Sequence, residues 1–435
     1  MPADDRVPAR SRADAAAKAG RLGRRGFLAA GAGVAAAALS GRAAQATTDN
    51  KYGPPHIPDW TKTLGPGVGD KPYGAPSPHE KQIIRRTVDW LTATKESSVS
   101  FTPIAEQLGI ITPSGLHFER HHAGIADIDP KAHRLVVHGM VEREMIFTMD
   151  DIRRFPSASV VRFIECPANG GMEWRGAQLE RCQYVRGMVS CSEWTGVPLR
   201  TLLRETGVKA GAKWMLAEGA DAAAMTRSVP IQKVLDDAML CYGQNGEAIR
   251  PEQGYPLRLL LPGWEGNMSV KWLRRLEFGD QPWHTREETS KYTDLMPDGR
   301  SRQFTWFMEA NSVVTFPSPE RPLDGKGFYE MTGFAWSGLG RVRRVDVSID
   351  GGRNWSPARL HDPIYAKALT RWSLPFRWNG EPLLVMSRAQ DDTGYVQPSI
   401  AELRKVRGVN SIYHNNSMLT WHVKAGGEVE NVQLK

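Results

Sequence analysis

The chain has 435 residues, of which 41% are hydrophobic, and its formal net charge is +8 at pH 7. That length is too great for one ordinary domain and suits two domains, each with its own core. Residues 1–46 hold eight Lys and Arg against three Asp and Glu, so most of the excess charge lies there. The remaining charge is nearly balanced, which argues against a nucleic-acid-binding protein.

Residues 1–46 have the layout of an export signal. Arg24 and Arg25 precede a weakly apolar run at 29–39, and Ala-Gln-Ala at 44–46 follows as a small-residue cleavage site. The paired arginines and the low hydrophobicity predict a twin-arginine signal peptide and a periplasmic location, with an ordinary secretory leader as the alternative. The run is too short and too weakly apolar for a membrane span.

The next segment, 47–95, is rich in Pro and Gly and predicts an extended N-terminal arm with one short helix over 79–94. Beyond it, strand and helix signals interleave without a regular βαβ period, which favours an α+β domain. Thr148 and Asp151 form a capping box for a helix that stops before Pro156. The strands that we expect are 135–138, 160–165, 213–216, 240–242, 255–261 and 270–278.

Two further local signals lie in this region. Pro198 suits the first turn of a helix that Gly207 can end. Asn245-Gly246 is a hairpin turn signal.

After about residue 320 the helix signals are absent. Strands are expected at 329–336, 342–349 and 383–388, with Asp350-Gly351-Gly352 as a hairpin connection between two of them. Several short strands over roughly 110 residues predict an immunoglobulin-like sandwich.

The four cysteines include no C-x-x-C pair, which excludes the usual zinc ribbon, thioredoxin motif and c-type haem site. Cys166 follows the strand 160–165 and precedes the small residues of 167–171. Small residues after a strand let the backbone approach a ligand closely, so a thiolate could be presented at the mouth of the sheet. The alternative is an inert buried thiol.

The segment 163–170, Phe-Ile-Glu-Cys-Pro-Ala-Asn-Gly, resembles the cysteine loop of the sulfite oxidase family, in which the Cys sulfur binds molybdenum. Segments at 194–199, 254–258, 262–263, 270–273 and 348–352 are similar to further family segments, in the same order. The resemblance runs from about 115 to 425. It implies an α+β molybdopterin-binding domain over 96–315 and an all-β immunoglobulin-like dimerisation domain over 316–435.

The resemblance also implies roles for individual residues. Cys166 would bind molybdenum, Arg120 would face the substrate, and Tyr292 would donate a hydrogen bond to a bound oxyanion. Arg407 matches an arginine that reaches in from the C-terminal side, with an exposed charge as the alternative. The residues expected to bind a single molybdopterin are His122, Asn169, Asp221, Arg258, Ser269 and Lys271.

For four of these residues a role without function is the alternative. Arg258 and Lys271 would supply the cations that the phosphate of molybdopterin needs, unless they are surface charges beside strands. His122 and Asp221 could equally be solvated loop residues.

Four positions depart from the family pattern. Gly170 and Gly171 stand where sulfite oxidases carry two arginines, Gln253 replaces a histidine, and His121 replaces the asparagine of an R-N-H motif. A less cationic and roomier pocket argues against tight binding of a small dianion. It suits sulfur tethered to another protein, where the carrier supplies binding energy remotely.

Within the family, the chain resembles the molybdenum subunit of bacterial thiosulfate-oxidising (Sox) systems. That similarity implies oxygen-atom transfer from water to carrier-bound sulfur, with no haem in this chain. It implies a separate c-type cytochrome subunit (SoxD-like), a Sox sulfur-carrier protein and homodimerisation through the C-terminal domain. The alternatives are a free-sulfite dehydrogenase, a sulfoxide reductase on the same cofactor fold, and a non-catalytic scaffold.

Overall fold

A computed structural model describes residues 76–88, 92 and 94–434 of the chain. The predicted signal peptide and most of the predicted arm lie outside the described residues. Within them, no helix is long and apolar enough to cross a membrane.

The helix predicted over 79–94 is wrong. Pro78–Glu80 forms a single 3-10 turn (η2), and Arg86–Thr87 is a strand (β1). β1 pairs with β2 (Val99–Phe101), which pairs in turn with β3 (Glu119–Arg120). Sheet pairing with a distant segment therefore overrides the local helix signal.

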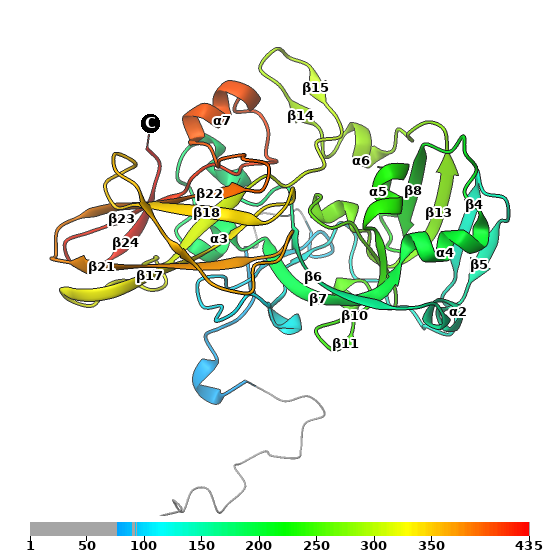
Figure 1. Cartoon of the computed structure of the whole chain (residues 1–435), viewed down its shortest axis with the longest axis horizontal. Helices are drawn as coiled ribbons and strands as arrows, with labels where there is room; N and C mark the ends of the chain where they lie inside the picture. Colours follow the sequence, from blue (N-terminus) through cyan, green and yellow to red (C-terminus); the bar gives the residue numbers. More distant parts are fainter. Residues whose placement is uncertain (1–75, 89–91, 93, 435) are drawn as a thin grey trace, which may run out of the picture. The chain divides into compact units, whose positions relative to one another are not determined.

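Two sheets form the first part of the described chain, one of them wholly antiparallel and the other mixed (Figure 1). One has the order β11-β10-β7-β6 with β12 beside β10, and comprises β6 (Ala158–Glu165), β7 (Val189–Pro198), β10 (Met239–Gln244), β11 (Glu247–Ala248) and β12 (Arg258–Leu260). The other has the order β5-β4-β13-β8-β9, and comprises β4 (Leu135–Gly139), β5 (Met145–Phe147), β8 (Trp214–Gly219), β9 (Thr226–Pro230) and β13 (Leu273–Gly279).

Short helices connect these strands. They are α2 (Met149–Arg154), α3 (Cys182–Arg186), α4 (Leu199–Thr206), α5 (Ile231–Asp236) and α6 (Arg286–Thr289), with 3-10 turns η4 (Ser114–Leu116), η5 (Gly171–Arg175), η6 (Pro251–Gln253) and η7 (Gly266–Met268).

Two of these helices show why the sequence folds as it does. The capping box of α2 is present, because Thr148 accepts from Asp151 N and the Asp151 side chain accepts from Thr148 N. α4 buries Leu199, Leu202 and Leu203 against the β4-β13-β8 sheet. Burial contributes about 2 kcal/mol for each such leucine.

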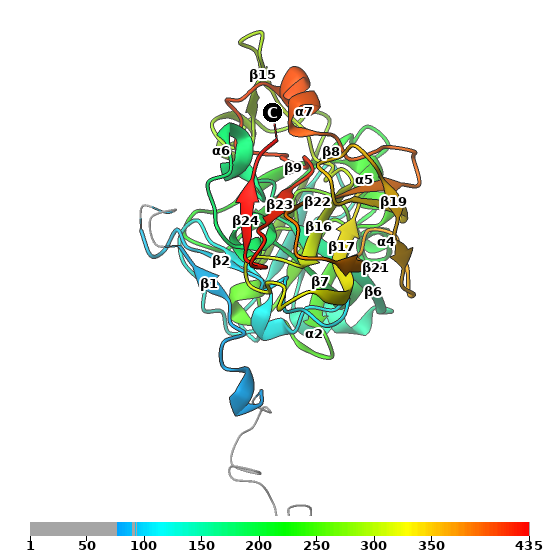
Figure 2. The ribbon, with the colours of Figure 1, turned by 90° about the vertical axis from the view of Figure 1, so that its left-hand side faces the viewer.

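Two antiparallel sheets form the C-terminal sandwich (Figures 1 and 2). The order β16-β17-β21-β20 comprises β16 (Asn311–Phe316), β17 (Gly327–Trp336), β20 (Arg359–Leu360) and β21 (Thr370–Trp378). The order β19-β18-β22-β23-β24 comprises β18 (Val342–Ser348), β19 (Ser356–Pro357), β22 (Leu383–Asp391), β23 (Thr420–Val423) and β24 (Val429–Val432). A separate hairpin is formed by β14 (Asp294–Leu295) and β15 (Ser301–Arg302).

One element of this region contradicts the expectation of strands alone. Ile400–Arg407 is a helix (α7), and Ser399 and Glu402 form its capping box. The capping pattern is visible in the sequence. However, the buried apolar residues of this eight-residue helix, Ile400 and Leu403, are too few to give a recognisable helical periodicity.

The sandwich shares one hydrophobic core with the sheet that contains β6 and β7. Phe163 of β6 and Val185 of α3 belong to the same buried cluster as Trp336, Trp372 and Trp421 of the sandwich. The indole of Trp336 also donates to Glu165 Oε2 over 2.7 Å. The strand that directly precedes Cys166 is therefore anchored to the sandwich.

Candidate active site

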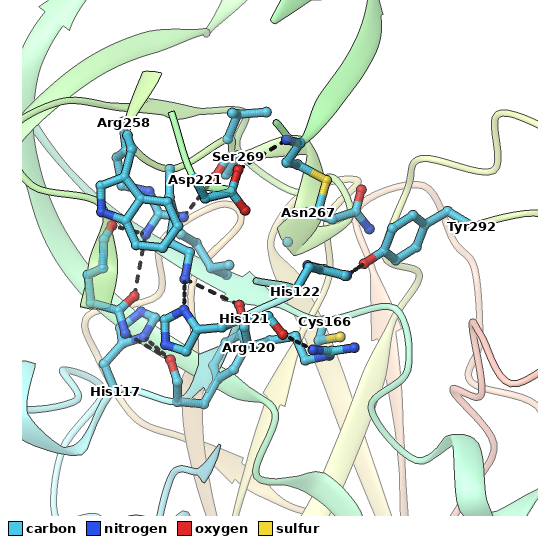
Figure 3. A pocket seen from close by; sticks show the side chains of 18 residues that line it. His117, Arg120, His121, His122, Cys166, Asp221, Arg258, Asn267, Ser269 and Tyr292 are labelled. Atoms are coloured by element: carbon cyan, nitrogen blue, oxygen red, sulfur yellow. Dashed lines mark hydrogen bonds between the residues drawn. The ribbon is translucent and has the colours of Figure 1, made fainter. Parts of the chain in front are cut away.

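A pocket lies beside Cys166, the residue that directly follows β6 (Figure 3). Its lining comes from separated segments of the chain, so only the folded structure brings these groups together. The lining includes eight of the residues named from the sequence, namely Arg120, His122, Cys166, Asp221, Arg258, Ser269, Lys271 and Tyr292.

Cys166 is placed by the backbone on both sides of it. Its amide donates to Met188 O over 3.0 Å, and its carbonyl accepts from Asn169 N over 2.9 Å. The thiol is buried, and burial raises the pKa of Cys166 to about 11. All four cysteines are free and buried, but Cys166 is the one that lines this pocket.

Tyr292 and His122 form one wall beside Cys166. The Tyr292 hydroxyl and His122 Nε2 are hydrogen-bonded over 2.7 Å. Burial and the neighbouring Arg120 charge lower the pKa of His122 to about 3, so its imidazole is neutral at pH 7. Burial also raises the pKa of Tyr292 well above its ordinary value, and the phenol keeps its proton. The pair is a neutral hydrogen-bonding unit.

The opposite end of the pocket is cationic (Figure 3). Arg258 is buried, and its Nη1 and Nη2 donate to Gln253 O and Ser269 O, both over 3.0 Å. Burial lowers the pKa of Arg258 to about 10, which leaves it charged at neutral pH. Lys271 Nζ lies 2.9 Å from His121 Nδ1 and donates to Arg120 O and Glu252 O over 3.2 and 3.0 Å.

Asp221 and Ser269 occupy the region between these ends. Asp221 Oδ1 accepts from Met225 N over 3.1 Å, which holds the loop that follows β8. Ser269 Oγ accepts from Leu261 N over 3.0 Å, so its own hydroxyl proton is still available to a ligand.

Asn169 and Arg407 do not line the pocket. Asn169 donates to Glu165 Oε1 over 2.9 Å and accepts from Met188 N over 3.2 Å, so it braces the loop around Cys166. Arg407 Nη2 donates to Glu309 Oε1 over 2.9 Å, and its Nη1 donates to Asp294 Oδ2 over 3.4 Å.

A buried charge network, which the sequence did not reveal, joins Arg407 to the pocket. Glu309 Oε2 lies 3.8 Å from His414 Nδ1, and His414 Nε2 lies 2.7 Å from Glu265 Oε1. Arg227 Nη1 donates to Glu265 Oε2 over 3.3 Å, and its guanidinium lies 5.1 Å from the Tyr292 ring centroid.

Comparisons with known proteins agree with this geometry. Residues 122–287 match the oxidoreductase molybdopterin binding domain, and residues 302–420 match the Mo-co oxidoreductase dimerisation domain. The sulfite oxidase of Gallus gallus is 31% identical over 354 residues, which cover 74% of this chain and 76% of that protein. The chain belongs to the sulfite oxidase family.

A solved structure extends the likeness within this family. The crystal structure of the sulfane dehydrogenase SoxCD from Paracoccus pantotrophus is 53% identical, with a TM-score of 0.85, and the match covers 87% of this chain and 98% of that chain. An NADH nitrate reductase of Ulva prolifera is 33% identical over 333 residues, but this chain spans only 38% of its length.

The family assignment confirms three predictions. The resemblance to sulfite oxidases and SoxC-type subunits is confirmed, as is the α+β cofactor domain followed by a β-rich dimerisation domain. The cofactor is molybdenum–molybdopterin, which is the group that the matched domain binds.

The pocket fits this cofactor. A thiol lies at one end, and the buried Arg258 lies at the other, where an anionic tail would need a cation. Arg258 Nε and His117 Nε2 are buried in the pocket wall without a hydrogen-bond partner among the described residues. Such orphaned polar atoms are costly unless a ligand satisfies them. Cys166 would hold the metal as a thiolate, while Arg258 and Ser269 would hold the anionic phosphate end of the cofactor.

The expectation that Gly170 and Gly171 make the pocket roomier is wrong. Neither glycine lines the pocket. A Cβ on Gly171 would lie 2.2 Å from Ile412 O, and a Cβ on Gly170 would lie 1.7 Å from Arg186 Nη1. The glycines therefore make room for the chain around 412 and for a buried arginine rather than for substrate.

Proposed function

We propose that this chain is the molybdenum-containing catalytic subunit of a sulfane dehydrogenase, which oxidises sulfur bound to a carrier protein and passes the electrons to a c-type cytochrome subunit. The observation that carries the proposal is the 53% identity to a SoxCD chain, which is matched over 98% of its length. The family's sulfur chemistry and the pocket around Cys166 support it.

The pocket residues would have different roles in the reaction. When bound at Cys166, molybdenum would supply two-electron oxygen-atom transfer to sulfur, with water as the oxygen source. Tyr292, oriented by His122, would donate its hydroxyl hydrogen to a developing oxyanion. Arg120 would attract the anionic sulfur group, because it is the cation whose charge most affects the Cys166 thiol.

The charge around Cys166 supports a tethered substrate. Arg120 is the arginine that lines the Cys166 end of the pocket, and the other lining arginine, Arg258, lies at the opposite end. Few cations give weak attraction for a small free dianion. A carrier protein compensates for weak local binding, because contacts remote from the sulfur supply binding energy.

We assign Arg407 and Asn169 positioning roles. Arg407 acts on the pocket through Glu309, His414 and Glu265, since its own side chain is engaged in ion pairs. Asn169 acts by bracing the Cys166 loop.

The remaining proposals concern assembly and location. Residues 302–420 match a dimerisation domain, which supports homodimerisation through the sandwich. The SoxCD likeness supports a SoxD-like cytochrome partner. The paired arginines of residues 1–46 support export to the periplasm by the twin-arginine route.

The test is reduction of cytochrome c by the purified protein with its cytochrome subunit, first with a persulfidated carrier protein and then with free sulfite. The proposal predicts fast reduction with the loaded carrier and slow reduction with sulfite. The reverse ranking would establish a free-sulfite dehydrogenase, which Arg120 and the 31% identity to a sulfite oxidase favour as the second candidate.

A further inference from the structure

His117 lies in the pocket wall, at the end occupied by Arg258 rather than by Cys166 (Figure 3). Its side chain is fully buried, and Nε2 has no hydrogen-bond partner among the described residues. The ring packs edge-on against Trp194 at 5.7 Å and stacks on Phe118 at 5.4 Å between ring centroids. A packed imidazole whose one unpartnered nitrogen lies in a ligand pocket can form a hydrogen bond with a bound ligand.

The backbone determines which nitrogen is free. His117 Nδ1 lies 3.0 Å from Phe118 O, which can only accept, so Nδ1 carries a proton. The same carbonyl accepts from Gln253 Nε2 over 2.9 Å. Gln253 is therefore turned toward Phe118 O and donates to it, while Nε2 of His117 remains available in the pocket.

The other cationic side chains at this end have already used most of their donors. Lys271 has three partners at hydrogen-bond distance, so its three protons are engaged within the protein. Arg258 Nη1 donates to Gln253 O and Gln253 Oε1, Nη2 donates to Ser269 O, and Nε has no partner among the described residues. These two residues mainly supply charge, which leaves a shortage of directed hydrogen bonds for an anion.

We propose that His117 is a phosphate-binding residue of the cofactor pocket, and that its Nε2 makes a hydrogen bond to the phosphate end of molybdopterin. The inference rests on the cofactor assignment and is independent of the substrate.

The proton for this bond is available without changing the charge of the empty site. Burial and the charges of Arg258, Arg85 and Lys271 hold the pKa of His117 near 3, so the imidazole is neutral before binding. A phosphate monoester has its second pKa near 6. The phosphate monoester can bind as the monoanion, which still carries its proton. Alternatively, the dianion binds and one proton is taken up from water. In both cases a single proton lies between Nε2 and the phosphate oxygen.

The experiment measures binding rather than turnover. Cofactor-free full-length protein is titrated with inorganic phosphate by calorimetry, and the molybdopterin content of protein from a competent host is measured by pterin fluorescence. The variants are His117→Phe, which keeps the ring packing, and His133→Phe as the matched control. His133 is also buried with an unpartnered Nε2, but it lies outside the pocket.

The proposal predicts that H117F weakens phosphate binding by about tenfold to a hundredfold, which corresponds to one hydrogen bond to a charged group. It also predicts a lower pterin content for H117F, with both properties unchanged in H133F. Phosphate binding by folded H117F that equals wild type overturns the proposal.

One measurement on the wild-type chain guards against a variant that does not fold. The ¹⁵N signal of His117 Nε2 should shift on addition of inorganic phosphate, and an unmoved signal under saturating phosphate also overturns the proposal. Wild-type protein that contains molybdopterin but oxidises no sulfur compound would count against the proposed function and leave this inference intact.

Discussion

Tyr292 and His122 are 170 residues apart in the chain, yet the phenol oxygen of one lies 2.7 Å from Nε2 of the other. Tyr292 has a φ of 50°, a conformation that is costly for a bulky residue. The Arg227 guanidinium over its ring and the Tyr413 ring 5.2 Å away hold it there. The hydroxyl is thereby aimed at the Cys166 end of the pocket.

Replacing Tyr292 by Phe removes this hydroxyl and keeps the ring. We expect kcat to fall by about a hundredfold, because a preorganised donor to a developing oxyanion is lost. The molybdopterin content should not change. Tyr395→Phe is the control, since its hydroxyl bonds Asn416 and not a pocket residue. An unchanged kcat in Y292F would remove Tyr292 from the catalytic machinery.

The Cys166 thiol gives a second prediction. Cys166→Ser should lower turnover and bound molybdenum by more than about a hundredfold, because a serine hydroxyl is a much poorer ligand for a soft metal than a thiolate. Pterin fluorescence should remain close to wild type, since the cationic end of the pocket is intact. Cys191→Ser is the matched control, because that thiol is equally buried but lies outside the pocket. Equal molybdenum content in C166S and C191S would contradict the assignment.

The charge network predicts a pH dependence of stability. Burial alone would lower the pKa of His414, but Glu265 and Glu309 raise it to about 9. The ordinary value is about 6.5. This contribution to the free energy of unfolding is therefore fully present below about pH 6.5 and is lost as the pH rises through about 9, by on the order of 3 kcal/mol.

His414→Gln should abolish the loss of stability between pH 7 and pH 9. At pH 6 the variant should be less stable by about 3 kcal/mol, because the buried Glu265 and Glu309 lose the positive charge of His414 that lies between them. Denaturant unfolding at the three pH values measures both effects. His422→Gln is the control, since that histidine forms a half-exposed pair with Glu430. An identical alkaline decline in wild type and H414Q would refute the network account.

Restoring an arginine beside the cysteine loop should not restore sulfite oxidation. Gly171→Arg places a Cβ 2.2 Å from Ile412 O, which is backbone and can move only with the chain around 412. We expect a loss of about 1–3 kcal/mol in the free energy of unfolding and no gain in free-sulfite turnover. Gly109→Arg, where nothing lies within 4 Å of the new Cβ, is the control. A stable G171R with fast sulfite turnover would show that the glycine alone excludes sulfite.

Local signals in the sequence predicted local structure well. Thr148 and Asp151 form the expected capping box. Asn245 and Gly246 have φ values of 51° and 79° and join β10 to β11 as expected. These motifs act within a few residues, so their outcome does not depend on the rest of the fold. The helix over 79–94 failed because Arg86 pairs with Phe101, a partner that no local pattern reveals.

In the site, too, residues within sequence motifs could be predicted, whereas residues defined by the fold could not. Cys166, Arg258 and Lys271 were named because they stand in an ordered family pattern, and the structure places them around one pocket. Arg407 was expected to reach that pocket, but its side chain forms ion pairs with Glu309 and Asp294 instead. His117 was not singled out, because neither its spacing nor its neighbours in sequence distinguish it. Its importance depends on burial and on an unpartnered nitrogen, which are properties of the folded chain.

The central claim is that sulfur held on a carrier is oxidised with oxygen from water. The oxidation of a carrier persulfide to a sulfonate, R–S–S⁻ plus three water molecules giving R–S–SO₃⁻, six protons and six electrons, fixes the stoichiometry. The most direct measurement counts cytochrome c reduced per carrier-bound persulfide in ¹⁸O-labelled water. The account predicts six electrons per persulfide and ¹⁸O in every added oxygen. Electrons obtained from free sulfite but none from the loaded carrier, or unlabelled oxygen in the product, would contradict it.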